Sequence, residues 1–259
     1  MMTPILSIII PQYKTPELIR LCIRAIKQFS SLHPEIIVVD NNSKDASLDY
    51  LKKIKNITLI ENKIKCDGAD AHKLALDLGI KKARGQWILF FHSDSIVLKK
   101  GWDEDLIDLT KKYPGTIGAT TIYRDINPFA PWYTKLLRYL KESSSFFNYT
   151  FEATNKKIMS YCFLIEREFL LKTKYQFHGS HGDVGDSLYQ IHIKNKKPFI
   201  LLGRKMLNQF IWHTSNATSL AAGLMSDEKS KQKFLKKRNQ LLSSDIIMSL
   251  LQNKALDKR

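Results

Sequence analysis

Two ionisable side chains, His92 and Asp94, directly follow a run of bulky apolar residues, Trp87–Phe91. The run shows no alternation of apolar and polar positions, which is typical of a strand buried on both faces. Side chains two positions apart on an extended chain point the same way, so this imidazole and this carboxylate can share one metal ion. The alternative interpretation is a strand followed by an ordinary Asp-Ser turn.

A glycine-rich segment at residues 178–186 carries a second pair of acids, Asp183 and Asp186. The residues after it have helical spacing, so the segment is expected to lead into a helix N-terminus, where a carboxylate stays ionised. Such a carboxylate can accept the proton of a hydroxyl nucleophile. We prefer Asp183 as the general base that would accept this proton, because the neighbouring Gly182 lets the backbone approach a substrate closely. Asp186 is the competitor, and both acids can instead be helix caps.

Strand and helix patterns alternate over the first hundred residues. The expected strands are 6–10, 35–39, 57–60 and 87–91, and helices are expected from Pro16, with Thr15 as N-cap, at 47–54 and at 68–84. The alternation predicts parallel strands joined by right-handed crossovers. Asp40 and Asp94 then lie at the same edge of the sheet, where α/β proteins bind ligands.

The pattern is looser after residue 100. Strands are expected at 116–121, 158–165, 199–202 and 207–211, and helices at 101–113, 133–140 and 187–194. The segment 124–141 is either a lid or acceptor loop that closes on substrate or a plain connection. From residue 226 onward Lys and Arg accumulate, which predicts a basic helical tail.

Composition narrows the class of protein. The formal net charge of +16, from 41 Lys and Arg against 25 Asp and Glu, favours an anionic partner. Three cysteines without a C-x-x-C pair support neither a disulfide framework nor a zinc knuckle, which fits a reducing cytoplasm. We find no signal-peptide pattern and no apolar run near the ~20 residues of a spanning helix. The G-x-G-x-x-G and Walker signatures are absent after the first strand.

Three segments together resemble a known family. They are Leu-Ser-Ile-Ile-Ile-Pro-Gln-Tyr-Lys at 6–14, Ile-Ile-Val-Val-Asp-Asn-Asn-Ser-Lys-Asp at 36–45, and Ala-Arg-Gly-Gln-Trp-Ile-Leu-Phe-Phe-His-Ser-Asp at 83–94. In this order they resemble bacterial-type family 2 glycosyltransferases of the GT-A fold. The resemblance covers the first 105 residues well, the next hundred loosely, and the tail not at all.

The resemblance implies an α/β, GT-A type Rossmann-like fold: a mostly parallel central sheet flanked by helices, with a C-terminal helical extension. We expect residues 1–105 to form a nucleotide-sugar-binding half, 106–215 an acceptor-binding half of the same domain, and 216–259 a basic helical tail. The protein is expected in the cytoplasm, with peripheral contact to the anionic inner face of the membrane through this tail.

The implied activity is inverting transfer of a sugar from a nucleotide-diphosphate sugar to a hydroxyl of a glycan or lipid-linked acceptor, in cell-surface polysaccharide or lipooligosaccharide synthesis. The implied cofactor is Mn or Mg. By position, the implied nucleotide-binding residues are Pro11, Tyr13, Asp40, Asn42 and Ser93. The implied metal ligands are Asp94, His92 and His213, with His92 in place of the first acid of the family's D-x-D, and the implied catalytic acids are Asp183 and Asp186.

Other basic side chains, namely His72, Lys14, Lys63 and Lys65, are weaker candidates for contact with the diphosphate. Two rival functions stay open. The presence of His92 allows a nucleotide-sugar-binding protein without catalysis. The net charge allows a nucleic-acid-binding protein, but no aromatic-basic RNA motif supports it, so no nucleic acid partner is expected.

Overall fold

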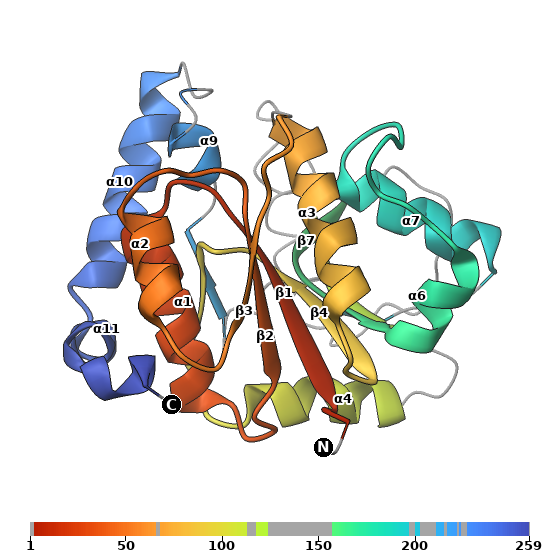
Figure 1. The fold of residues 1–259 in the computed structure, drawn as a ribbon, viewed down its shortest axis with the longest axis horizontal. Helices are drawn as coiled ribbons and strands as arrows, with labels where there is room; N and C mark the ends of the chain where they lie inside the picture. Colours follow the sequence, from red (N-terminus) through yellow and green to blue (C-terminus); the bar gives the residue numbers. More distant parts are fainter. Residues whose placement is uncertain are drawn as a thin grey trace, which may run out of the picture.

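The computed structural model describes residues 3–65, 68–112, 118–123, 157–196, 200–202, 211–214, 217–221, 223 and 227–258. A 7-stranded sheet of order β3-β2-β1-β4-β7-β6-β8 lies at its centre, with helices on both faces (Figure 1). The strands β1 (Leu6–Gln12), β2 (Glu35–Asp40), β3 (Thr58–Glu61) and β4 (Trp87–Phe91) are mutually parallel. The expected mostly parallel sheet is therefore confirmed.

The second half of the sheet contains one reversed strand. β7 (Lys157–Glu166) runs antiparallel to both β4 and β6 (Gly118–Tyr123), and β8 (Ile200–Leu202) runs parallel to β6. A separate two-stranded sheet pairs β5 (Ser95–Val97) antiparallel with β9 (Ile211–His213).

Buried apolar runs produce the central strands because both faces of the sheet are covered. Along β1, Ile8 and Ile10 join the core cluster beneath helix α1 (Pro16–Phe29), whereas Ile9 joins the cluster on the opposite face. The strand expected at 6–10 continues through Pro11 to Gln12, so the predicted end of the strand at Pro11 is wrong. β4 pairs with β1 only as far as Ile9, so at Pro11 the strand has one sheet neighbour and tolerates the missing amide.

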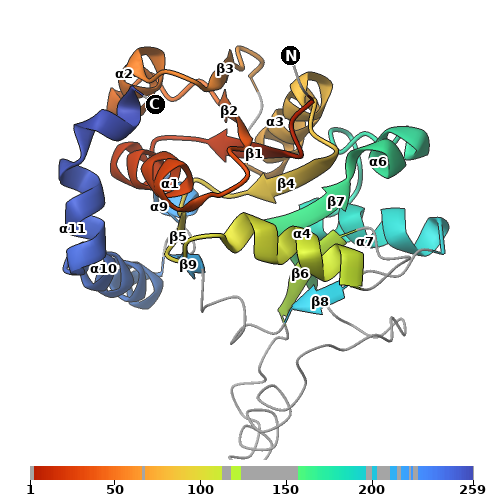
Figure 2. The ribbon, with the colours of Figure 1, turned by 90° about the horizontal axis from the view of Figure 1, so that it is seen from below.

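One face of the sheet is covered by α1, α2 (Ala46–Lys53) and α4 (Trp102–Lys112). The C-terminal segment begins with α9 (Ala217–Ala221), whose first residue contacts Asp94. It continues in α10 (Glu228–Leu242), α11 (Asp245–Gln252) and η1 (Lys254–Asp257), and α10 and α11 lie on the outer side of α1 (Figure 2). Arg24 on α1 binds the carboxylate of Asp257 through two hydrogen bonds, of 2.8 and 2.5 Å. It also donates to the carbonyls of Leu250 and Leu251. The expected helical extension is therefore bonded to the first helix of the fold.

The other face carries α3 (Gly68–Lys82), α6 (Arg167–Thr173) and α7 (Val184–Lys194). Gly79 lies inside α3, where glycine ordinarily weakens a helix. A Cβ atom at this position would lie 2.4 Å from Cγ2 of Ile9. The glycine thus allows α3 to lie close against β1.

Several elements differ from expectation. The sequence patterns did not predict β5, β9 as a partner of β5, or α6. The helix expected at 133–140 lies outside the described residues, as does most of the strand expected at 207–211. Across the ranges described here, no helix combines the length and apolar character needed to cross a membrane.

Candidate functional site

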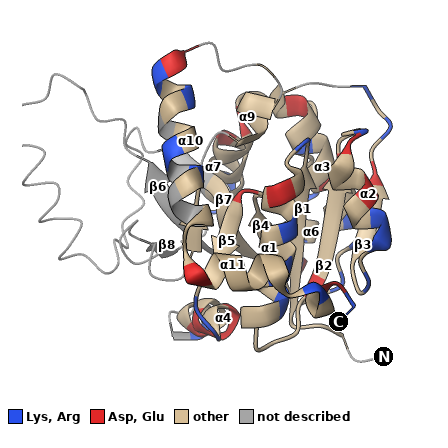
Figure 3. Cartoon of the chain, turned by 90° about the vertical axis from the view of Figure 1, so that its left-hand side faces the viewer, with Lys and Arg blue, Asp and Glu red and all other residues tan. Residues whose placement is uncertain are grey.

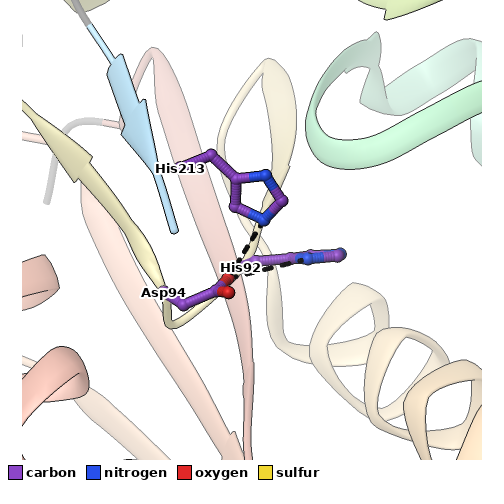
Figure 4. Close-up of side chains that lie close together, drawn as sticks. All are labelled: His92, Asp94 and His213. Carbon is purple, nitrogen blue, oxygen red and sulfur yellow. Dashed lines mark ion pairs between the residues drawn. The ribbon is translucent and has the colours of Figure 1, made fainter. Parts of the chain in front are cut away.

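The carboxyl ends of the parallel strands place the candidate ligands at one edge of the sheet. Asp40 is the last residue of β2, and His92 and Asp94 follow β4. His213 comes from far along the chain: β9 pairs with β5 so that His213 lies opposite Ser95, next to Asp94. His92, Asp94 and His213 therefore form one cluster (Figure 4).

Geometry within the cluster suits a shared cation. Oδ1 of Asp94 lies 3.2 Å from Nε2 of His213 and 4.0 Å from Nδ1 of His92. One ligand atom from each residue lies within 4.8 Å of the others. The other carboxylate oxygen accepts the Thr214 hydroxyl at 3.2 Å and the Ala217 N–H at 3.5 Å. Two imidazoles and one carboxylate are a donor set that suits Mn²⁺ and later transition metals.

Electrostatics favour the ligand forms of Asp94 and His92. Burial alone would raise the pKa of the Asp94 carboxyl, but the neighbouring His213 and His92 outweigh it and hold the pKa well below its usual range. Burial, followed by the nearby His72, lowers the pKa of His92 well below its ordinary value. A metal ligand must be an ionised carboxylate or a neutral imidazole, and both conditions are met.

Strand β7 orients both imidazoles. The hydroxyl of Ser160 lies 3.1 Å from Nε2 of His92, while the ring of Tyr161 stacks on His213 at 4.0 Å between centroids. The backbone N–H of His92 also donates to the backbone carbonyl of Tyr161. Such outer contacts fix ligand orientation. The sequence analysis missed both residues because their approach depends on an antiparallel β4–β7 register that no local pattern encodes.

Helix α3 contributes a further histidine. The ring of His72 lies 5.0 Å from that of His92. Burial lowers the pKa of His72 to about 4, against the opposing charges of Asp183 and Asp94. His72 was a weak candidate from sequence, and the fold brings it beside the cluster.

The expected nucleotide-binding residues lie at the same edge. Both carboxylate oxygens of Asp40 accept hydrogen bonds from Ser43, at 2.9 and 2.6 Å, and burial raises the pKa of Asp40. The Lys14 N–H donates to the Ser43 hydroxyl, which ties the end of β1, with Pro11 and the following Tyr13, to the residues after β2.

The remaining expected residues differ in exposure. Asn42 is exposed in a left-handed conformation, with φ of 60°. Ser93 is buried, and its hydroxyl lies 3.2 Å from that of Thr15. Lys63 and Lys65 are exposed after β3.

The acidic loop, residues 177–183, ends in a reciprocal cap at the start of α7. The Asp186 N–H donates to Oδ1 of Asp183 at 3.0 Å, and the Asp183 N–H donates to Oδ2 of Asp186 at 2.9 Å. This arrangement satisfies the first amide groups of the helix. Both acids therefore act as caps in the structure, and Asp183 is also near enough to His72 for its charge to act on that imidazole.

Comparison with known proteins places this fold. The chain is similar to S. aureus TarS residues 1–349, with a TM-score of 0.59 and 15% identity over 96% of this chain and 75% of that one. It is also similar to the mannosyltransferase PcManGT of Pyrobaculum calidifontis, with a TM-score of 0.54 and 16% identity over 98% of this chain and 80% of that one. These likenesses define a GT-A type fold.

The sequence places the chain within a family. The model of glycosyl transferase family 2 matches residues 7–173, and the chain belongs to this family. A stretch of 98 residues, 36% of this chain, is 36% identical to the poly(ribitol-phosphate) beta-glucosyltransferase of Bacillus spizizenii. That stretch spans 15% of the relative's length.

Proposed function

We propose that this chain transfers a sugar, with inversion, from a nucleotide-diphosphate sugar to a hydroxyl of a glycan or lipid-linked acceptor, in cell-surface polysaccharide or lipooligosaccharide synthesis. The cluster of His92, Asp94 and His213 at the carboxyl edge of the sheet carries the proposal. Family membership supports it, as do the titles of similar structures, which name UDP-GlcNAc for TarS and GDP-Man with Mn²⁺ for PcManGT. The name of the B. spizizenii relative supports a surface polymer as acceptor.

The proposed roles follow the positions of the side chains. Asp94, His92 and His213 hold Mn²⁺ or Mg²⁺, which when bound neutralises charge on the diphosphate. The base and ribose lie against the strand ends, where the proposed contacts are Pro11, Tyr13, Asp40, Asn42 and Ser93. Since Ser43 already donates to both carboxylate oxygens of Asp40, a nucleotide contact there shares or replaces one of these hydrogen bonds.

The proposed transfer is a single displacement. The acceptor oxygen forms a bond to the anomeric carbon while the bond from that carbon to the diphosphate oxygen breaks. The acceptor proton passes to the carboxylate of Asp183, and the nucleoside diphosphate leaves with the bonding electrons. A positioned carboxylate contributes about 10²–10⁴-fold to such a step.

A matched pair of substitutions tests the base. Asn is as good an N-cap as Asp, so Asp183→Asn is expected to keep the helix cap while lowering kcat by about 10²–10⁴-fold, with little change in donor affinity. Asp186→Asn is expected to lower mainly the melting temperature. Measurement of kcat, of donor binding by calorimetry and of melting temperature separates the two. Exchanged phenotypes would make Asp186 the base, and two fully active variants would leave the loop a structural cap.

We further propose that the protein acts in the cytoplasm, in peripheral contact with the anionic inner face of the membrane. Lysine and arginine residues recur along the length of α10 (Figure 3). Three apolar side chains of α10 and α11 are also exposed: Leu235 at 43%, Ile246 at 48% and Met248 at 44%. Basic residues near an anionic surface contribute about 1 kcal/mol each, and exposed apolar side chains add to this.

A further inference from the structure

Two side chains of α3, one helical turn apart, bind the acidic loop at residues 177–183. The carboxylate of Asp77 accepts the N–H groups of Phe177, at 3.0 Å, and His178, at 2.8 Å. The ammonium group of Lys73 donates to the carbonyl of Ser180 at 2.7 Å. Residues four apart lie on the same side of a helix, so one face of α3 holds the loop at two points.

The burial of Lys73 is costly and needs an explanation. Its side chain is 3% exposed, and the carboxylate with which it forms an ion pair, that of Asp70, lies 3.7 Å away and is itself 61% exposed. Lysine is almost never fully buried without a partner, because the ammonium group loses its hydration. An unbranched apolar side chain such as Met would fill the same space without this cost. The hydrogen bond that this buried ammonium group makes is the one to the Ser180 carbonyl of the acidic loop.

The same turn of α3 also reaches the candidate metal cluster. His72 precedes Lys73, and its ring lies 5.0 Å from that of His92. Gly79 allows this helix to lie close against β1. One rigid helix thus contacts the cluster through His72 and the acidic loop through Lys73 and Asp77.

We propose that Lys73 and Asp77 are positioning residues that fix the acidic loop relative to the His92–Asp94–His213 cluster. The inference rests on the proposed function, because it makes this placement the condition for Asp183 to reach the acceptor hydroxyl. A displacement of about 1 Å in a catalytic group can cost about 100-fold in rate. Neither side chain is among the proposed nucleotide contacts, so substitution of either residue is expected to lower kcat and to leave the affinity for the donor nearly unchanged.

The test compares Lys73→Met and Asp77→Asn with Lys82→Met, an exposed lysine in the last turn of the same helix. The two loop variants are expected to lower kcat by about 10- to 100-fold, with affinity for UDP and GDP in the presence of Mn²⁺ within about twofold of wild type. Lys82→Met is expected to change neither quantity.

A double-mutant cycle separates positioning from a general structural role. If Lys73 acts through Asp183, Lys73→Met has no further effect on the residual turnover of Asp183→Asn. An equal fold-loss in both backgrounds overturns the proposal, and so does a kcat for Lys73→Met that matches Lys82→Met.

Hydrogen exchange keeps this result distinct from failure of the proposed function. If the wild-type chain transfers no sugar, the proposed function fails, and the exchange rates of amides 177–183 still decide whether Lys73 and Asp77 hold the loop. Faster exchange in both loop variants than in Lys82→Met supports the attachment. Unchanged exchange overturns it.

Discussion

Asp94 is 4% exposed, yet it faces two imidazoles and also accepts hydrogen bonds from Thr214 and Ala217. A buried carboxylate is ordinarily costly, and here the surrounding donors keep it ionised. The oxygen held by Thr214 and Ala217 fixes the orientation of the group, so that the other oxygen points to the histidines. One oxygen therefore orients the carboxylate while the other is placed to bind the metal, as in a preorganised metal ligand.

Removal of the charge at Asp94 is expected to weaken metal binding strongly without unfolding the chain. In Asp94→Asn the side-chain oxygen still accepts from Thr214, but the anionic ligand is lost. We expect Mn²⁺ affinity, measured by calorimetry, to fall by about 100-fold or more, since even outer contacts of metal sites are worth about 10–100-fold. Asp108→Asn, at an exposed position on α4, is the control. Equal Mn²⁺ affinity in both variants would remove Asp94 from the metal site.

At the scale of single elements, α3 shows how packing serves the site. The helix lies against β1 at Gly79, holds the acidic loop through Lys73 and Asp77, and places His72 beside His92. Residues 72 and 79 are about two helical turns apart, roughly 10 Å. A shift of the helix at Gly79 would therefore be transmitted to its N-terminal turns.

A methyl group at Gly79 is expected to push α3 away from the sheet. The added Cβ of Gly79→Ala would meet Ile9 at 2.4 Å, and overpacking of this kind costs about 1–3 kcal/mol, against about 1 kcal/mol gained in helix propensity. We expect a net loss of stability in denaturant unfolding and a lower kcat. In a cycle with Ile9→Ala, the two changes should cost less together than their sum. If the losses in unfolding free energy of the two single variants simply add in the double variant, the proposed contact between position 79 and Ile9 is wrong.

At the scale of the whole molecule, Arg24 and Asp257 join the first helix to the end of the described chain. The Tyr50 hydroxyl donates to the same carboxylate at 2.9 Å, and the Lys55 N–H donates to the Asp257 carbonyl. Burial raises the pKa of Asp257, but the hydrogen bonds from Arg24 and Tyr50 outweigh burial and leave the pKa below its usual value. The ionised carboxylate is therefore the form that the fold favours.

This depressed pKa predicts a pH dependence of stability. The contribution is complete above the unfolded-state value of about 3.9 and is lost as the pH falls through the lower folded-state pKa. At neutral pH, Asp257→Asn should lower the free energy of unfolding by about 1.5–3 kcal/mol, as for a hydrogen bond to a charged group. The difference from wild type should shrink in acid below pH ~4. A difference that is constant with pH would show that the charge on Asp257 plays no part.

The attachment of the tail also decides how membrane contact is tested. Ile247, Leu250 and Leu256 are buried in the same core cluster as the apolar residues of α1, so deletion of the tail would disturb the fold. Reversal of exposed charges avoids this. Lys229→Glu with Lys236→Glu should weaken binding to anionic vesicles by about 2 kcal/mol or more, at about 1 kcal/mol per lysine, and leave binding to neutral vesicles unchanged. Lys52→Glu with Lys53→Glu on α2 is the control pair. Identical vesicle binding by both pairs would exclude α10 as the contact.

The sequence predicted the elements whose signals are local. Apolar runs located β1, β2 and β4, Pro16 located the start of α1, and the strand-end rule placed Asp40 and Asp94 at one edge. The position of His213 beside Asp94 came from family resemblance, because a three-residue strand pair has no pattern of its own. Ser160, Tyr161 and the buried Lys73 could not be predicted, because their surroundings depend on register and helix packing between distant segments.

Because His213 reaches the cluster only through the pairing of β9 with β5, the cluster is completed late in chain synthesis. During synthesis, His92 and Asp94 emerge long before His213, so the full ligand set exists only after the later strand has emerged and docked. An ion bound by all three side chains would then join early and late parts of the chain, much as a covalent cross-link does. Metal retention would report that the second half of the chain has reached its native place, whether or not any sugar is ever transferred.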